Sequence, residues 1–283
     1  MVGGACWAFV IGLLGVVGGC LSFGDITGGE TSDAALDAEG NDVQSIDSGL
    51  PSDAALMTDS PIGAAFCVSQ VDAAFCDSFD QVDAATFSGW QPPHVDNGAS
   101  LTLTTSGLSP PEALLAEVRA NLTGSLQVGA NISRLVGDAV SVRYEYDLLV
   151  DTYDTSGSVA FIGAMDERVG LADVELRLYL NAVGVGLGAA IADPDGATSF
   201  PTFASELSLS VGNWHHVTVD VDYGRTPAKV SFSFDTVSVF ADADVPGATF
   251  GPGAITAQAG FLYARTPTAG WKIRVDNVVV YTN

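Results

Sequence analysis

Alternating apolar and polar residues give the clearest pattern in the chain, and residues 213–223 are one segment that shows it. Three valines occupy alternate positions there, separated by mostly polar residues: Val217, Val219 and Val221. A period of two is typical of a strand with one face buried and the other in water. Residues 224–228 interrupt the pattern, and it resumes over residues 229–240. The pattern therefore predicts two successive strands joined by a short connection.

Two other segments, residues 140–148 and 174–180, alternate just as regularly. The apolar residues at alternate positions are Val140, Val142, Tyr144, Tyr146 and Leu148 in the first segment, and Val174, Leu176, Leu178 and Leu180 in the second. Successive side chains of a strand point to opposite faces, so we expect these residues to point inward. Shorter runs at 100–105, 158–163 and 259–263 predict further strands.

The spacing of these runs predicts an all-β domain. About ten to thirteen short strands with no convincing long helix are typical of a two-sheet antiparallel sandwich. Residues 112–121 are ambiguous, because their Ala, Leu and Glu content also suits a helix. A jelly roll is the topology that we expect.

Several segments resemble the concanavalin A-like and laminin-G-like jelly-roll domains. In that family a Trp-His-x-Val strand, here Trp214 to Val217, is followed by a strand that ends in Asp-Gly. Asp235-Thr236 stands in the place of Asp-Gly here. Residues 75–80 and 275–281 resemble the opening and closing strands of secreted members. The resemblance implies that these two strands are neighbours, that residues 112–121 form a strand, and that 64–283 is one sandwich domain.

The charge balance excludes one class of partner. The formal net charge is −24, from 34 acidic and 10 basic residues, and no Lys or Arg precedes Arg119. Nucleic-acid binding depends on neutralising phosphates with Lys and Arg, so we expect no nucleic-acid partner.

The N-terminus carries the features of an export signal. The apolar run 5–19 is about fifteen residues long, shorter than the roughly 20 residues that span a bilayer, and it suits a signal core. Val17-Gly18-Gly19-Cys20 resembles the bacterial lipobox. We therefore predict a signal peptide over 1–20, lipidation of Cys20, and anchoring at the bacterial outer membrane or cell surface. Ordinary secretion and an uncleaved anchor are the alternatives.

Residues 21–63 hold nine acids and no bases, and they are rich in Gly, Ser, Asp and Ala. Such a composition buries too little apolar surface to offset the entropy of ordering, so we predict a disordered acidic tether. Cys67 and Cys76 form the only pair beyond Cys20. In an oxidising compartment an even pair predicts a disulfide, with free thiols as the alternative.

One motif bears on catalysis. Glycoside hydrolases of the resembling family carry Glu-x-Asp-x-x-Glu, whose carboxyl groups flank the scissile bond. Here Glu145 and Asp147 match the first two positions, but Val150 occupies the third and transfers no proton. We interpret the two acids as the wet side of a strand. Ligand contact and hydrolysis are the alternatives.

The candidate ligand site combines an aromatic platform with polar groups. Glu145, Asp147, Arg177 and Tyr179 are all predicted on outward strand faces, and they form one glycan site if their strands are neighbours. His215 and His216 are adjacent on a strand and point to opposite faces, so they do not ligate one ion together.

The resemblance also implies a structural ion where the first and last strands meet. Asp80 and Asp276 are the matching residues by position, and carboxylates are the oxygen ligands that calcium prefers. Surface acids without a metal are the alternative.

The fold supports several functions, so three hypotheses stand. The leading one is a surface-tethered, non-catalytic module that binds a glycan or a protein partner. The second is a diverged polysaccharide-cleaving enzyme, either hydrolase or lyase. The third is a structural envelope protein.

Overall fold

The computed structural model describes residues 64–80, 87, 89–120, 128–154, 159–169, 172–192, 198–203, 207–245, 253–265 and 269–283. These residues form fifteen strands and one short helix, α1 (Ala64–Val68). The predicted signal peptide, Cys20 and the tether lie outside the described residues. Among the described residues, no helix is long and apolar enough to cross a membrane.

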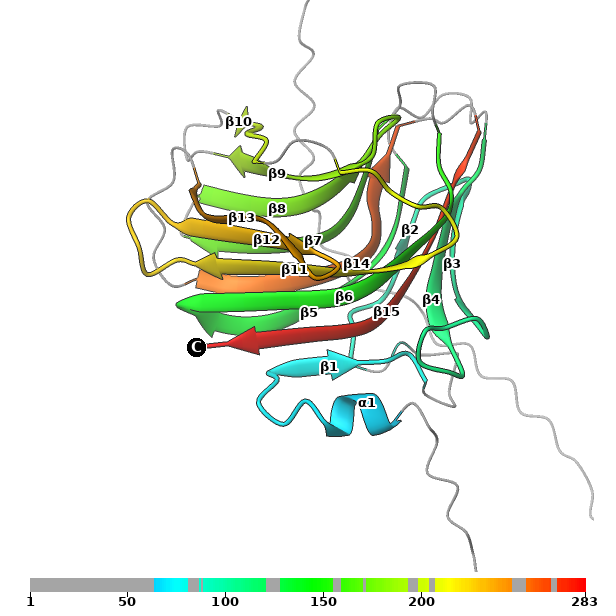
Figure 1. Cartoon of the computed structure of the whole chain (residues 1–283), viewed down its shortest axis with the longest axis horizontal. Coiled ribbons are helices and arrows are strands. Elements are labelled where there is room, and N and C mark those ends of the chain that lie inside the picture. Colours follow the sequence, from blue (N-terminus) through cyan, green and yellow to red (C-terminus); the bar gives the residue numbers. More distant parts are fainter. Residues whose placement is uncertain are drawn as a thin grey trace, which may run out of the picture. The chain divides into compact units, whose positions relative to one another are not determined.

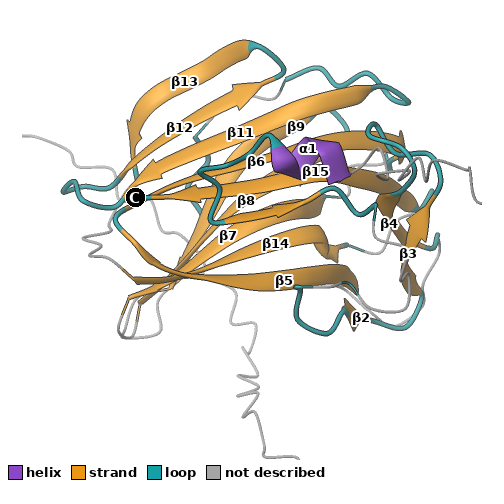
Figure 2. Cartoon of the chain, turned by 90° about the horizontal axis from the view of Figure 1, so that it is seen from below, coloured by secondary structure: helices purple, strands orange, loops and turns teal. Residues whose placement is uncertain are grey.

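The strands form two antiparallel sheets, as predicted (Figures 1 and 2). Sheet A has the order β13-β12-β11-β6-β15-β4-β3, and β1 also pairs with β15. Its strands are β1 (Phe75–Asp77), β3 (Ala99–Thr104), β4 (Ala113–Val118), β6 (Ser141–Thr152), β11 (Trp214–Asp222), β12 (Lys229–Phe234), β13 (Val237–Asp244) and β15 (Trp271–Thr282).

Sheet B has the order β10-β9-β8-β7-β14-β5-β2. Its strands are β2 (His94–Val95), β5 (Val128–Ala139), β7 (Ala160–Val169), β8 (Ala172–Leu180), β9 (Val185–Ala192), β10 (Thr198–Ser199) and β14 (Gly253–Ala264). In Figure 1 the strands β11 to β13 of sheet A lie in front of sheet B, so that each sheet has an inner face and an outer face.

The inner faces enclose one apolar core, and the alternating positions supply it. Of the predicted inward residues, Tyr144, Leu148, Leu176 and Val217 are each at most 2% exposed. Burying an aliphatic side chain of this size contributes about 1.5–3 kcal/mol, so the alternation fixes which face each strand buries. Val140 was predicted inward but is 44% exposed, because it precedes β6 at the end of the sheet.

The ends of the domain meet as the resemblance implied. β1 pairs with β15 in the register Phe75↔Val280, and β15 also pairs with β6 and β4. Residues 113–118 form the strand β4, which confirms the strand prediction for that segment. The Cys67–Cys76 disulfide is present and ties α1 to β1.

The turn between β12 and β13 accommodates Thr236 in the place of the usual Gly, because the residue with a positive φ is Asp235. Asp235 has φ of 56°, the left-handed conformation that Gly adopts freely and that Asp tolerates better than most residues. Its carboxylate also accepts a hydrogen bond from the His216 backbone amide and contacts the His215 ring. The acid therefore anchors the turn to β11.

Candidate functional site

The four predicted ligand residues do not form one site. Glu145 and Asp147 lie on β6 in sheet A, whereas Arg177 and Tyr179 lie on β8 in sheet B. All four point away from the core, so the two pairs lie on opposite outer faces. The condition for a shared site is not met, because β6 and β8 are not neighbours. Alternation assigns a residue to a face of its own strand and does not say which strands are neighbours.

The outer face of sheet B carries an aromatic hollow of about 590 Å³. Its rings are Phe161 on β7, Tyr179 on β8, Tyr263 on β14 and Phe200 just after β10. Phe200 is 67% exposed, and the other three rings are partly buried. Asn181 and the exposed Arg265 contribute polar groups to the lining. We call this cavity the aromatic hollow.

Cross-strand pairing places the rings in one row. Phe161 is the register partner of Tyr179 on β8 and of Tyr263 on β14. The Phe161 and Tyr263 ring centroids are 4.6 Å apart, a separation at which aromatic pairs attract each other. Three adjacent strands therefore present a continuous aromatic surface.

Arg177 supports this surface and is only 6% exposed. Its Cζ lies 4.9 Å from the Phe161 ring centroid and 5.3 Å from that of Tyr263, within cation–π range. Nη1 donates to the Tyr263 hydroxyl oxygen at 2.7 Å, and Nη2 donates to Glu175 at 2.5 Å. Nε is buried without a hydrogen-bond partner among the described residues. Burial raises the pKa of the Tyr263 phenol, although Arg177 opposes that shift.

Tyr179 lies over β9, where Gly186 makes room for its ring. A Cβ atom at Gly186 would come within 2.5 Å of Tyr179 Cζ, whereas one at Gly188 would be 3.6 Å from Cδ1. Any larger residue at position 186 would displace the ring. Gly186 therefore fixes where the Tyr179 ring can lie in the hollow.

The charge of the hollow differs from that of the whole chain. The described residues that line it include Arg265 and no Asp or Glu. Acids outnumber bases by 34 to 10 over the chain. The guanidinium of Arg177 adds a positive charge beside the hollow, because it contacts the lining rings of Phe161 and Tyr263.

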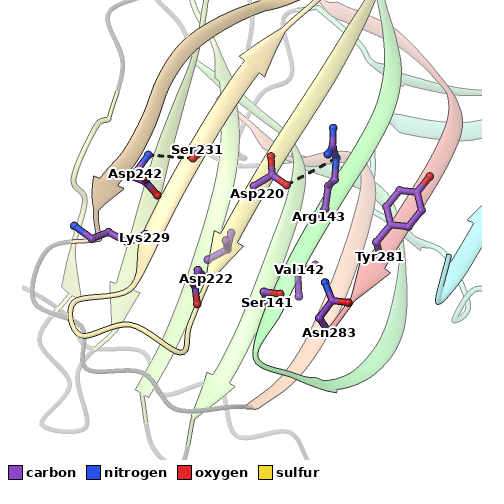
Figure 3. A pocket seen from close by; sticks show the side chains of 11 residues that line it. Ser141, Val142, Arg143, Asp220, Asp222, Lys229, Ser231, Asp242, Tyr281 and Asn283 are labelled. Atoms are coloured by element: carbon purple, nitrogen blue, oxygen red, sulfur yellow. Dashed lines mark hydrogen bonds and ion pairs between the residues drawn. The ribbon is translucent and has the colours of Figure 1, made fainter. Parts of the chain in front are cut away.

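The outer face of sheet A is polar and densely paired. Arg143 forms an ion pair with Glu145. Its Nε also lies 3.8 Å from an oxygen of Asp220 (Figure 3). Together with Tyr281 from β15, Arg143 and Asp220 border a depression of about 330 Å³.

Asp147 is also fully engaged on this face. It accepts hydrogen bonds from Asn277 Nδ2 at 2.8 Å and pairs with His216 Nδ1 at 2.8 Å. The hydrogen bond to Asp147 is the main cause of a raised His216 pKa. His215 is buried instead, against Asp235 and Ser210, so the two histidines have separate surroundings as predicted.

The predicted metal residues, Asp80 and Asp276, lie where β1 and β4 meet along β15. Asp276 is fully buried and accepts hydrogen bonds from the Ser109 amide and hydroxyl. Asp80 Oδ1 accepts from the Glu112 amide, and Oδ2 is buried without a partner among the described residues. Burial raises the Asp276 pKa to about 7, and the charge of Asp80 adds to the shift.

Two buried carboxylates, one with an unpartnered oxygen, suit a hard cation chemically. The described residues hold no cluster of three or more His, Cys, Asp or Glu side chains that would fit a metal. Backbone carbonyl oxygens would therefore have to supply the remaining ligands.

Comparisons with known proteins identify the fold. No protein-family profile matches the sequence, and no curated protein matches it. Among solved structures, an endo-β-1,4-glucuronan lyase from Trichoderma reesei superposes with a TM-score of 0.57 at 13% identity, over 75% of this chain and 96% of that one.

A Bacteroides ovatus enzyme of a mixed-linkage glucan locus, from glycoside hydrolase family 16, has a TM-score of 0.53 at 14% identity, over 73% of this chain and 99% of its own. A cellulose-induced protein has a TM-score of 0.51 at 14% identity, over 74% of this chain and 97% of its own. The chain has a concanavalin A-like jelly-roll fold. At these identities the likeness shows the fold alone.

Sequence reasoning missed Phe161, Tyr263, Phe200 and Arg265. Strict alternation puts Phe261 and Tyr263 on the same face, yet Phe261 is fully buried and Tyr263 lines the hollow. A register shift between these two residues turns the strand. Bulges of this kind re-aim side chains and leave no regular signal in the sequence.

Proposed function

We propose that the protein binds a polysaccharide in the aromatic hollow and does not cleave it. The observation that carries this proposal is the row of Tyr179, Phe161 and Tyr263 on three adjacent strands, bordered by Phe200 and Arg265. Ligand sites are concave and largely apolar, with a few polar groups that fix orientation. The C–H faces of sugar rings pack on aromatic rings, and their hydroxyls bond to the polar rim.

The relatives in fold support a glycan ligand. The solved structures that superpose with TM-scores above 0.5 include a glucuronan lyase and a glucan-locus enzyme, and each acts on a polysaccharide by its name. This chain shares their sandwich, so the same kind of ligand is the natural first candidate.

The residues favour binding over hydrolysis. Glycoside hydrolysis uses two carboxyl groups about 5–9.5 Å apart at the scissile bond. None of the described lining residues carries a carboxyl group. Glu145 and Asp147 lie in the other sheet, and both are engaged by Arg143, His216 or Asn277.

Cleavage of the polysaccharide by elimination, as in a lyase, is disfavoured for a different reason. A tyrosine that removes a proton works best when its pKa lies near the working pH. Burial raises the pKa of Tyr263 instead, so its phenol stays protonated and acts as a hydrogen-bond donor.

The decisive experiment scores retention and cleavage together. Purified protein is incubated with a panel of insoluble or immobilised polysaccharides, and both bound protein and released reducing or unsaturated sugar are measured. We expect retention without product, and loss of retention in Tyr179→Ala. Tyr281→Ala, which removes a tyrosine from the outer face of sheet A, is the matched control and should bind normally. Released product would show that the protein is an enzyme and overturn the proposal. No retention would favour the structural envelope hypothesis.

The rest of the proposal concerns location. We propose that the protein is exported, that Cys20 carries a lipid, and that residues 21–63 hold the sandwich away from the membrane. Metabolic labelling with a radioactive fatty acid tests this, because Cys20→Ser should lose the label.

We further propose that calcium binds between Asp80 and Asp276. Their buried oxygens would hold the ion. Its charge would offset the two neighbouring carboxylates, and its bonds to both would link the end of β1 to β15. Thermal unfolding with calcium and with chelator tests it: chelator should lower the midpoint by several degrees, as expected when a ligand of the native state is removed. Asp80→Asn should make the midpoint indifferent to calcium. A wild-type midpoint that calcium leaves unchanged would refute the site.

A further inference from the structure

We infer that the aromatic hollow selects sugars that carry an anionic group, and that the Tyr263 hydroxyl is the donor that receives it. This inference rests on the proposed polysaccharide binding and names the ligand class of the same site. Three observations carry it: the direction of the Arg177–Tyr263 hydrogen bond, the burial of Arg177, and the charge of the lining.

The hydrogen bond between Arg177 and Tyr263 fixes the role of the phenol. A guanidinium only donates, so at 2.7 Å its Nη1–H points to the Tyr263 oxygen, which accepts. The phenol hydrogen must then point elsewhere, and no described residue accepts it. Tyr263 lines the hollow, so its O–H is available to a ligand there.

The buried cation strengthens that donor. Chains of hydrogen bonds polarise one another, and a phenol that accepts from a guanidinium becomes a better donor. Its best acceptor is an oxyanion, because charge-assisted hydrogen bonds are about twice as strong as neutral ones. Tyr263 therefore favours a carboxylate or sulfate oxygen over a sugar hydroxyl.

The electrostatic surroundings agree with an anionic ligand. Arg177 is 6% exposed, and its only ion pair among the described residues is with Glu175, itself partly exposed. Nε is buried and has no hydrogen-bond partner among the described residues. Arg265 adds a second positive charge at the rim, and the described lining contains no acid to oppose an anion.

The net charge of −24 makes binding of an anionic polymer a specific test of the hollow. The chain as a whole repels anionic polymers, so any affinity for them must come from a local site. Non-specific attraction cannot imitate the result.

The test compares charged polysaccharides with neutralised forms of the same backbones. Binding of the full-length protein to polygalacturonate, alginate and glucuronan is measured by titration, beside the methyl ester of each. Dextran sulfate and dextran separate sulfate from carboxylate as the source of the anion. We expect at least one anionic polymer to bind about tenfold more tightly than its uncharged form.

Two variants assign the effect to the hollow. Tyr263→Phe keeps the ring and removes the donor, so it should weaken binding of the anionic form much more than binding of the uncharged form and abolish most of the preference. Arg265 is exposed, so Arg265→Gln should fold normally and should bind the anionic polymer several-fold more weakly. Tyr281→Phe removes a hydroxyl on the opposite face and should change nothing.

The outcomes separate this inference from the proposed function. A preference for uronates or for dextran sulfate that Tyr263→Phe abolishes supports the inference and identifies the anion. Equal binding of charged and uncharged forms, both lost in Tyr179→Ala, overturns the inference and leaves polysaccharide binding intact. A preference that survives Tyr263→Phe also overturns it. Failure of every polysaccharide to bind refutes both proposals.

Discussion

The two outer faces of the sandwich contain the same local pair in opposite settings. On sheet A, Arg143 pairs with Glu145, and on sheet B, Arg177 pairs with Glu175, each two residues apart on one strand. The Arg143 side chain is 52% exposed, whereas that of Arg177 is 7% exposed. Aromatic rings cover the second guanidinium, and water surrounds much of the first.

The difference shows that burial, and not pairing, decides what an arginine does here. An exposed ion pair is screened by water and contributes about 0–1 kcal/mol. A buried guanidinium loses hydration and depends on every remaining partner. Arg177 therefore holds Phe161 and Tyr263 together in the aromatic hollow, while Arg143 only balances the charges of its face.

The largest expected effect comes from replacing each arginine by methionine. Arg177→Met removes the donor to Tyr263 and the cation beneath two rings, so we expect a loss of about 2–3 kcal/mol in the free energy of unfolding. Arg143→Met should cost less than about 1 kcal/mol. Both variants lower the net charge by one, so general charge effects cancel. Urea denaturation of the two proteins measures the difference, and equal losses would contradict the comparison.

A second pair of variants tests the floor of the hollow. Gly186→Ala brings a Cβ to 2.5 Å from Tyr179 Cζ, so the ring must move, and we expect about 1–2 kcal/mol of destabilisation together with weaker glycan binding.

Gly188→Ala is the matched control, since its Cβ would make ordinary contacts of 3.4 Å and 3.6 Å. Its effect should be within about 0.5 kcal/mol, because Ala also restricts the unfolded chain. Thermal melts of both variants check this, and equal losses of stability would mean that Tyr179 is not held by position 186.

The smallest expected effect is a pH dependence on the face of sheet A. The pKa of His216 is raised in the folded protein, chiefly by its hydrogen bond to Asp147, with Glu145 contributing and Arg143 opposing. A raised pKa means that the folded state favours the protonated ring. This contribution is complete below the unfolded pKa of about 6.5 and disappears as the pH rises through the folded pKa.

His216→Gln should therefore destabilise the protein at pH 5.5 and have little effect at pH 8.5. The side chain is 43% exposed, so we expect less than about 1 kcal/mol. Unfolding midpoints of both proteins across this range provide the measurement. A difference that is constant with pH would show that Asp147 does not hold the proton on His216.

The sequence by itself determined the class of fold and the face of most strands. Alternation over 140–148, 174–180 and 213–223 identified strands whose apolar residues are buried, because a one-residue change of parity would turn every valine and leucine to water. The Cys67–Cys76 pair and the neighbouring end strands also followed from sequence features. These are local properties, or properties of segments with distinctive motifs.

Only the tertiary structure decided where the site lies. Arg177 and Tyr179 were predicted outward, but their partners Phe161 and Tyr263 come from β7 and β14, which are distant in sequence and adjacent in sheet B. A bulge aims Tyr263 outward, and Gly186 of β9 makes space for Tyr179. Strand order, register shifts and side-chain clearance arise from long-range packing, which alternation within one strand does not encode.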